Sequence, residues 1–259
     1  MLLTEFDTDR DAVINPDIIH KPVAGFPETV VSIFSHHLFR RVVDALHGKE
    51  IAHTKDVDGI WPVYEVTYKG KRLALYKARL GAPACVGCFE DIIPMGARRI
   101  ILLGNCGVLD KSIEDCAVII PERAIRDEGT SYHYAEASDY IEVNKKYKDL
   151  FRSVLEEHGY PYIIGTTWTT DGFYRETRGK IARRKQMGAI CVEMECAAMQ
   201  AMCDFRGVEF FQFLYAGDSL AQTHWDPRSL GGLERLDEKE RIALLALELA
   251  AKIEEGKTC

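Results

Sequence analysis

The sequence lacks several features that would assign it to a common protein class. Its 259 residues contain no apolar run of about 18 residues, the length that a membrane-spanning helix needs. No basic, apolar and small-residue leader stands at the N-terminus. We therefore expect neither a membrane span nor a secretory signal, and we expect a cytoplasmic protein.

Positive charge is scarce as well. Lys and Arg number 33 against 40 Asp and Glu, a formal net charge of −7. A surface for nucleic acid needs clustered basic residues in excess, so no nucleic-acid partner is expected. The sequence also has no Gly-x-Gly-x-x-Gly after a first strand and no Walker lysine loop. These absences argue against a sugar-nucleotide or dinucleotide binder.

Metal-binding patterns are missing too, although the chain has eight cysteines. Most of them lie in apolar surroundings, which is typical of buried free thiols. The one close pair, Cys85 and Cys88, has no second Cys-x-x-Cys and no nearby pair of histidines. The histidines offer no His-x-x-x-His spacing. We predict no metal and no cofactor.

Apolar strand candidates alternate with amphipathic helix candidates along most of the chain. Residues 1–28 are expected to form an N-terminal arm, followed by one α/β domain over residues 29–259. Expected strands lie at 29–34, 59–68, 72–78, 98–103, 117–121, 162–169, 189–192 and 209–216, the second and third forming a hairpin around Lys69 and Gly70. Expected helices lie at 38–46, 84–95, 147–158, 180–187, 196–205 and 238–255. The alternation predicts a single domain with a mainly parallel mixed central sheet flanked by helices.

Polar clusters follow three of the expected strands. They are Gly-Asn-Cys-Gly at 104–107, Thr-Asp-Gly-Phe-Tyr at 170–174 and Gly-Asp-Ser at 217–219. The carboxyl ends of parallel strands are where ligands bind in such sheets. Each cluster alone is typical of a turn, but together their chemistry is complementary.

The run Val-Glu-Met-Glu at 192–195 stands where a short apolar strand meets a helix of small residues. Ionised carboxylates accept hydrogen bonds from vicinal hydroxyls, and a thioether offers a soft apolar surface to a sugar face. The run therefore suits the binding of a polyhydroxylated sugar. An ordinary strand end with solvated acids is the alternative.

In chain order these motifs resemble the nucleoside phosphorylase superfamily of the purine nucleoside and uridine phosphorylase type, with its related nucleosidases. The motifs lie at 81–84, 104–107, 124–129, 171–174, 192–195 and 217–218. The resemblance implies a twisted central sheet flanked by helices and subunits that assemble as a homodimer or homohexamer. It also implies reversible cleavage of a nucleoside's N-glycosidic bond, usually by phosphate.

The resemblance assigns roles residue by residue. It implies that Glu195 binds the ribose hydroxyls, with Met194 packing on the sugar and Glu193 helping or positioning. It implies that Phe173 stacks on the base and that Asp218 protonates or hydrogen-bonds the leaving base. Base-binding candidates are thus Phe173, Cys106, Gly107 and Asp218, and Asp218 is the catalytic candidate.

The phosphate site departs from the family pattern. The sequence has Leu102 where the family carries an arginine, and the family's phosphate loop is replaced by residues 34–40. Arginine matches phosphate geometry, so its loss matters. We assign phosphate binding to a rebuilt set consisting of Asn105, Arg79, Ser35 and Arg40. Otherwise water is the nucleophile.

We expect a nucleoside phosphorylase that uses inorganic phosphate as co-substrate and needs no cofactor. The base preference leans toward a purine, because the Gln-x-Arg pair of uridine-cleaving members is absent after Tyr174. Three alternatives stay open. They are a hydrolase similar to methylthioadenosine nucleosidase, a uridine phosphorylase, and a non-catalytic nucleoside-binding protein.

Overall fold

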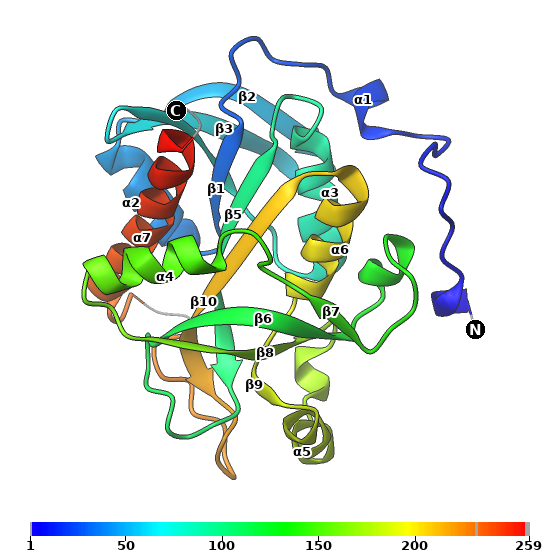
Figure 1. Ribbon diagram of the computed structural model, residues 1–259, viewed down its shortest axis with the longest axis vertical. Coiled ribbons are helices and arrows are strands. Elements are labelled where there is room, and N and C mark those ends of the chain that lie inside the picture. The colour runs from blue at the N-terminus through cyan, green and yellow to red at the C-terminus, as the bar shows by residue number, and fades with distance from the viewer. Residues whose placement is uncertain (1, 231–232, 257–259) are drawn as a thin grey trace.

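The computed structural model describes residues 2–230 and 233–256 as one mixed sheet with helices on its faces (Figure 1). The strands are β1 Thr29–Ile33, β2 Lys49–Asp56, β3 Gly59–Tyr68, β4 Lys71–Lys77, β5 Arg99–Val108, β6 Val118–Asp127, β7 Tyr140–Glu142, β8 Tyr162–Thr170, β9 Ala189–Glu193 and β10 Glu209–Ser219. The α-helices are α1 Pro16–Ile19, α2 His36–Ala45, α3 Ala82–Ile92, α4 Lys148–Glu157, α5 Arg178–Gln186, α6 Cys196–Arg206 and α7 Leu236–Glu255. Short 3-10 helices are η1 Leu2–Thr4, η2 Thr130–His133 and η3 Phe173–Arg175.

The sheet combines an open half with a closed half. In the open half β2, β3, β4, β1 and β5 are neighbours in that order. In the other half β5, β10, β6, β8 and β9 pair in sequence, and β9 pairs with β5 again. These five strands therefore form a closed ring. The α/β fold with a mixed sheet flanked by helices confirms the fold predicted from the sequence.

Two apolar layers hold the helices on the sheet. On one face α2, α4 and α7 cover alternate strand residues such as Ile101 and Phe213. On the other face α3 and α6 cover Leu102 and Phe210, among others. Figure 1 shows the two groups of helices on opposite sides of the sheet. The alternation along each strand explains the layers, because successive side chains point to opposite faces.

The β3–β4 hairpin lies where the sequence predicts it. Its turn contains Lys69 with φ 48° and Gly70 with φ 75°. Two positive φ values in succession are typical of the two-residue turn that matches the twist of paired strands. The edge strand β2 is absent from the sequence prediction, because its side chains are mostly exposed and carry no apolar alternation.

Three expected strand ends are wrong. The sequence predicts that strands end near Leu103, Pro121 and Ala216, but β5 continues to Val108, β6 to Asp127 and β10 to Ser219. Strands β5 and β10 stay paired through this region, with a register shift between Ala216 and Asp218. Pairing with neighbours outweighs the weak strand preference of glycine here. The polar residues of both clusters therefore lie on the sheet.

Two other sequence expectations concern thiols and membranes. The seven cysteines within the described ranges are buried and form no disulfide, and Cys259 lies outside those ranges. Among the described helices none is long and apolar enough to cross a membrane. The division into an arm over residues 1–28 and a domain from residue 29 stays a prediction.

Candidate active site

Three strands bring the central residues of the site side by side. Asp218 of β10 is the register partner of Gly107 in β5, and Gly107 is the partner of Val192 in β9. A Cβ atom on Gly107 would overlap with Cδ1 of Leu220 and would lie 3.1 Å from Oδ1 of Asp218. Glycine at this position therefore keeps room beside the Asp218 carboxyl group.

Glu195 stands at the start of α6 and is buried. The backbone N–H of Gly81 donates a hydrogen bond of 2.6 Å to its carboxylate. Burial raises the pKa of Glu195 to about 8, and the charge of Glu193 adds to the rise. The two motifs that contain Gly81 and Glu195 are thus joined in space.

Glu193 is fully engaged within the protein. Its Oε1 accepts hydrogen bonds from the hydroxyls of Thr167 at 3.2 Å and Thr169 at 2.6 Å. Its Oε2 accepts from the backbone N–H groups of Glu195 at 2.8 Å and Cys196 at 2.7 Å. A carboxylate at a helix N-terminus accepts hydrogen bonds from the free backbone amides and is stabilised by the helix dipole. Glu193 therefore fixes the start of α6 and positions Glu195.

Asp218 is a buried acid with one close partner. The indole N–H of Trp225 donates to its Oδ2 at 2.7 Å. Burial raises the pKa of Asp218, whereas the Trp225 hydrogen bond and the positive charge of Arg228 oppose the rise. A raised pKa is what a general acid near neutral pH requires. No local sequence motif connects Trp225 with Asp218.

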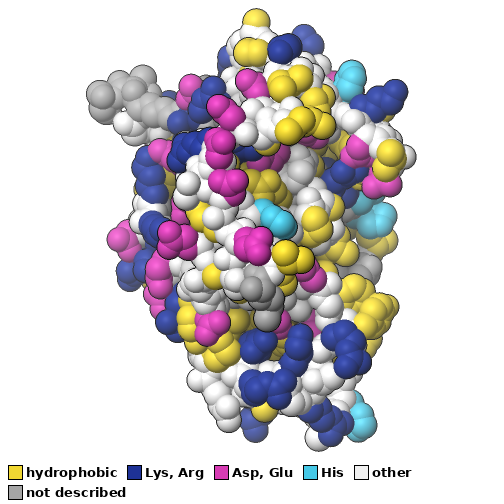
Figure 2. All heavy atoms as spheres, turned by 90° about the vertical axis from the view of Figure 1, so that its right-hand side faces the viewer, with side chains coloured by type: hydrophobic (Ala, Val, Ile, Leu, Met, Phe, Trp, Pro, Cys, Tyr) yellow, Lys and Arg dark blue, Asp and Glu magenta, His cyan; other side chains and the backbone are white. Residues whose placement is uncertain are grey.

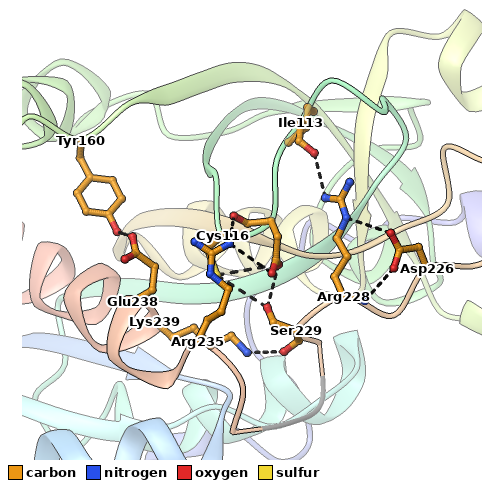
Figure 3. Close-up of polar contacts among 10 residues, drawn as sticks. Ile113, Cys116, Tyr160, Asp226, Arg228, Ser229, Arg235, Glu238 and Lys239 are labelled. Carbon is orange, nitrogen blue, oxygen red and sulfur yellow. Dashed lines mark hydrogen bonds and ion pairs between the residues drawn. The ribbon is translucent and has the colours of Figure 1, made fainter.

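A polar network fastens the segment that carries Trp225 (Figure 3). Backbone hydrogen bonds join Asp226 to Ser219 in both directions, at 2.8 and 3.0 Å. Arg228 donates to the carbonyl of Ile113 at 2.9 Å, and the ammonium of Lys239 on α7 donates to the carbonyl of Ser229. The chain beyond Trp225 is thus held between the β5–β6 connection and α7.

The predicted base-stacking and sugar-packing residues lie more openly. Phe173 is 48% exposed, and its ring centroid lies 4.1 Å from that of Tyr174. Met194 is partly buried between the two glutamates of its motif. The carboxylate of Asp171 accepts from the N–H of Gly129 at 2.9 Å, and its charge contributes to the raised pKa of Glu195. The roles of Phe173 and Met194 stay predictions.

Asn105 and Cys106 directly precede Gly107 in β5. The thiol of Cys106 is buried and lies 3.7 Å from the carbonyl oxygen of Tyr215, and burial raises its pKa. Asn105 lies beside Gly217, where a Cβ atom would be 3.2 Å from the Asn105 Nδ2 atom. Both residues therefore border the site through the β5–β10 pairing.

Arginine residues assigned to phosphate contact other side chains of the protein. Arg79 forms an ion pair with Asp56, and its guanidinium carbon lies 4.3 Å from the ring centroid of Trp61. Arg79 is therefore bound by a carboxylate and an indole face on the neighbouring hairpin, and its phosphate role stays a prediction. Leu102 itself is buried in the apolar layer under α3.

Arg40 lies in α2, and Ser35 is the N-cap residue of that helix. Arg40 donates to the hydroxyl of Tyr64 at 3.1 Å and to Asp44 at 3.0 Å. The hydroxyl of Ser35 accepts from the N–H of Leu38 at 3.3 Å and so caps the helix. Arg40 nevertheless lines a cavity of about 440 Å³ together with His36 and Lys77.

A second cavity of about 360 Å³ has Trp225, the partner of Asp218, in its wall, and the sequence gives no sign of it. It lies between α5 and the segment after β10. Its walls include Glu176, Ile181, Leu220 and Trp225. Sequence reasoning assigns Glu176 no role, because a charged residue after an aromatic pair is usually solvated.

Comparison with known proteins identifies relatives. The family model described as "Phosphorylase superfamily" matches residues 28–253. A purine nucleoside phosphorylase of DeoD type from Bacillus cereus is 27% identical over 161 residues, which are 60% of this chain and 66% of that protein. The match thus spans just under two thirds of that relative.

Solved structures share the fold. A uridine phosphorylase from Vibrio fischeri superposes with a TM-score of 0.74 at 20% identity, covering 93% of this chain and 99% of that one. A purine nucleoside phosphorylase from Toxoplasma gondii in complex with immucillin-H gives 0.77 at 18%, covering 89% and 93%. An AMP nucleosidase from Bacteroides thetaiotaomicron gives 0.73 at 17%, covering 92% of each chain.

Proposed function

Because the chain belongs to the phosphorylase superfamily, we propose that it cleaves the N-glycosidic bond of a nucleoside. One observation carries the proposal. Two buried carboxyl groups have raised pKa values: Glu195, two residues after β9, and Asp218, near the end of β10. Both strands pair with β5 around Gly107. Titratable groups tuned by burial at the end of a sheet are typical of a catalytic site.

The two acids suit the two ends of the bond. Cleavage develops positive charge on the sugar and negative charge on the base. Glu195, held by Gly81, accepts hydrogen bonds from ribose hydroxyls when ionised, and Met194 packs on the sugar. Asp218, whose pKa is raised by burial, donates a proton to the leaving base in this proposal. Phe173 stacks on the base by the likeness to the family.

Phosphate is the proposed acceptor of the sugar, giving the free base and ribose 1-phosphate. The likeness to phosphorylases supports this choice. In this proposal Asn105 and the backbone N–H groups beside it, with Ser35, supply hydrogen bonds to the anion. The base leans toward a purine, which the DeoD-type relative supports, and the assembly is a homodimer or homohexamer.

Hydrolysis is the second candidate, and the positions of two arginines favour it. Arg79 is paired with Asp56, and Arg40 with Asp44 and Tyr64. Each guanidinium thus already has a carboxylate partner within the protein. In this reaction water attacks the sugar and free ribose is released.

Base release from inosine and from uridine, each with and without inorganic phosphate, tests the proposal. Phosphorolysis requires phosphate and yields ribose 1-phosphate, whereas hydrolysis proceeds equally without phosphate and yields ribose. The Asp218→Asn variant is the control for catalysis by this site. Binding of either nucleoside without turnover by the wild-type protein would contradict the proposal and support a binding role.

A further inference from the structure

The N-terminal arm is fastened to the rest of the protein near both of its ends. It runs along the side that carries α3 and α6 (Figure 1), a face on which apolar side chains lie exposed among charged ones (Figure 2). His20 pairs with Asp91 of α3 at 3.1 Å, and at the other end η1 contacts η2. Between these points the arm is open to solvent, and Val13 is 99% exposed. The match to the family begins at residue 28, so the arm lies outside the matched region.

The arm tip, residues 2–10, packs around one aromatic side chain. Phe205 lies near the C-terminal end of α6. The ring of Phe6 meets Phe205 edge-on with centroids 6.4 Å apart, and the guanidinium carbon of Arg10 lies 5.4 Å from the Phe205 centroid. Tyr134, which directly follows η2, meets the same ring edge-on at 5.6 Å. Edge-to-face ring pairs and a cation over a ring are both attractive. The arm tip therefore joins the end of α6 to the loop that contains η2.

The same loop supports the candidate site through Gly129. A Cβ atom on Gly129 would lie 3.8 Å from Cδ2 of Leu3 in the arm tip and 3.8 Å from Oδ2 of Asp171. The N–H of Gly129 donates to that oxygen at 2.9 Å. Asp171 directly follows β8 and stands two residues before Phe173, the proposed base-stacking residue. Contacts thus run from the arm tip through Gly129 to the segment that carries Phe173.

We propose that the arm tip is a positioning element of the site, which holds Gly129 and Asp171 so that Phe173 stays in place to stack on the base. The inference rests on the proposed function, to which the stacking role of Phe173 belongs. Phe173 is 48% exposed and lies on a short 3-10 helix, so its own packing restrains it little. A segment with few buried contacts opens at a low free energy unless another element restrains it. Leu3 and Phe6 supply this restraint.

Steady-state kinetics with inosine test the proposal in the double variant Leu3→Ala, Phe6→Ala. We expect KM to rise about 3- to 10-fold, the equivalent of one stacking contact, and kcat to stay within about twofold, because the reacting groups keep their places. Phe6→Tyr keeps the ring and should behave as the wild type. Val13→Ala, in the exposed middle of the arm, is the matched control. An equal rise of KM in Val13→Ala, or an unchanged KM in the double variant, would overturn the proposal.

A comparison with Asp171→Ala tests the route through Gly129. In the Asp171→Ala background the arm substitutions should have no further effect on KM, because the link between the arm tip and Phe173 is already broken. Effects that simply add would show that the arm tip acts elsewhere and would reject this route.

Hydrogen exchange without substrate decides independently of turnover. In the double variant Leu3→Ala, Phe6→Ala the amides of residues 128–135 and 171–175 should exchange about 3- to 10-fold faster, in proportion to the change in KM, whereas the amides of β5 should be unaffected. If the wild-type protein cleaves no nucleoside, the proposed function fails, and exchange alone decides whether the arm tip holds this segment. Unchanged exchange in both ranges would reject the positioning role. Thermal melting of each variant shows that it is folded.

Discussion

The backbone N–H of Gly81 donates a 2.6 Å hydrogen bond to the carboxylate of Glu195, across 114 residues of sequence. Gly81 precedes α3 with φ 90°, a conformation that residues with a side chain rarely adopt. Glu195 directly precedes α6, with φ −136°. One hydrogen bond thus joins the N-termini of the two helices that cover one face of the sheet, and it fixes one oxygen of the proposed sugar-binding carboxylate.

The Glu195→Gln substitution is expected to change the pH dependence of stability. The pKa of Glu195 is raised from 4.5 in the unfolded chain to about 8 in the folded protein. Its contribution to stability is therefore fully present below pH 4.5 and is lost as the pH rises through 8. Glutamine stays neutral. The free energy of unfolding of the variant, relative to that of the wild type, should therefore rise by up to about 3 kcal/mol between pH 5.5 and pH 9.

Urea unfolding at pH 5.5 and pH 9 measures this difference. Glu255→Gln serves as the control because its side chain is exposed at the end of α7. If the difference in free energy of unfolding between Glu195→Gln and the wild type is the same at both pH values, Glu195 has the pKa of an ordinary glutamate.

The Trp225→Phe substitution is expected to shift the alkaline limb of activity. The indole hydrogen bond to Asp218 lowers the pKa of this acid, so its removal lets the pKa rise. A general acid acts in its protonated form, and activity is lost as the pH rises through its pKa. The limb for kcat should therefore move to higher pH in Trp225→Phe.

Profiles of kcat against pH for base release check this shift. In Asp218→Asn, kcat should fall by about 10²–10⁴-fold, the usual size of general acid catalysis. A limb that moves to lower pH in Trp225→Phe, or full turnover by Asp218→Asn, would remove Asp218 from the role of acid.

The Gly107→Ala substitution is expected to lower both stability and turnover. The added Cβ atom overlaps with Leu220 Cδ1 and lies 3.1 Å from the Asp218 carboxylate. Overpacking of this kind costs about 1–3 kcal/mol. The double variant Gly107→Ala, Leu220→Ala should regain stability but not turnover, because the contact with Asp218 remains.

Gly87→Ala is the matched control for this glycine. Gly87 lies within α3, and a Cβ atom there meets nothing within 4 Å. Alanine should stabilise the helix by up to about 1 kcal/mol. Denaturant unfolding and kcat measure both effects, and wild-type turnover by Gly107→Ala would show that the space beside Asp218 is not used.

The Arg79→Ala substitution is expected to affect stability and not phosphate. Arg79 packs on Trp61 and pairs with Asp56, so its removal leaves a carboxylate without its partner. Melting temperature should fall in Arg79→Ala and in Asp56→Asn, and the double variant should fall by less than the sum, as coupled residues do. If KM for phosphate instead rises tenfold with an unchanged melting temperature, Arg79 is a phosphate ligand as the sequence suggested.

Local patterns allow the fold to be predicted well. The hairpin around Gly70 and the passage from β9 into α6 at Glu195 both depend on residues close in sequence. The continuation of β5 through Gly107 does not, because it depends on pairing with β9 and β10, which lie far along the chain. Glycine in a strand looks like a turn until its neighbours are known.

In the candidate site, too, the sequence predicts some residues, whereas contacts between distant segments are not predicted. The acids Glu195 and Asp218 follow from motif order, but their partners do not. Trp225 meets Asp218 through a loop without a motif, and four hydrogen bonds turn Glu193 from a sugar-binding candidate into a support for α6. Arg79 forms an ion pair with Asp56, because a nearby carboxylate competes with a more distant anion for the guanidinium.

The closed ring of β5, β10, β6, β8 and β9 has a mechanical consequence. A strand in an open sheet can slip by two residues at the expense of one neighbour's register, whereas a strand in a ring has two neighbours that must slip with it. The register of β10 and β9 against β5 is therefore held from both directions around the ring. This register places Asp218 and Val192, three residues before Glu195, on either side of Gly107. A register change in one strand would have to pass through the other strands of the ring before Asp218 moved relative to the start of α6.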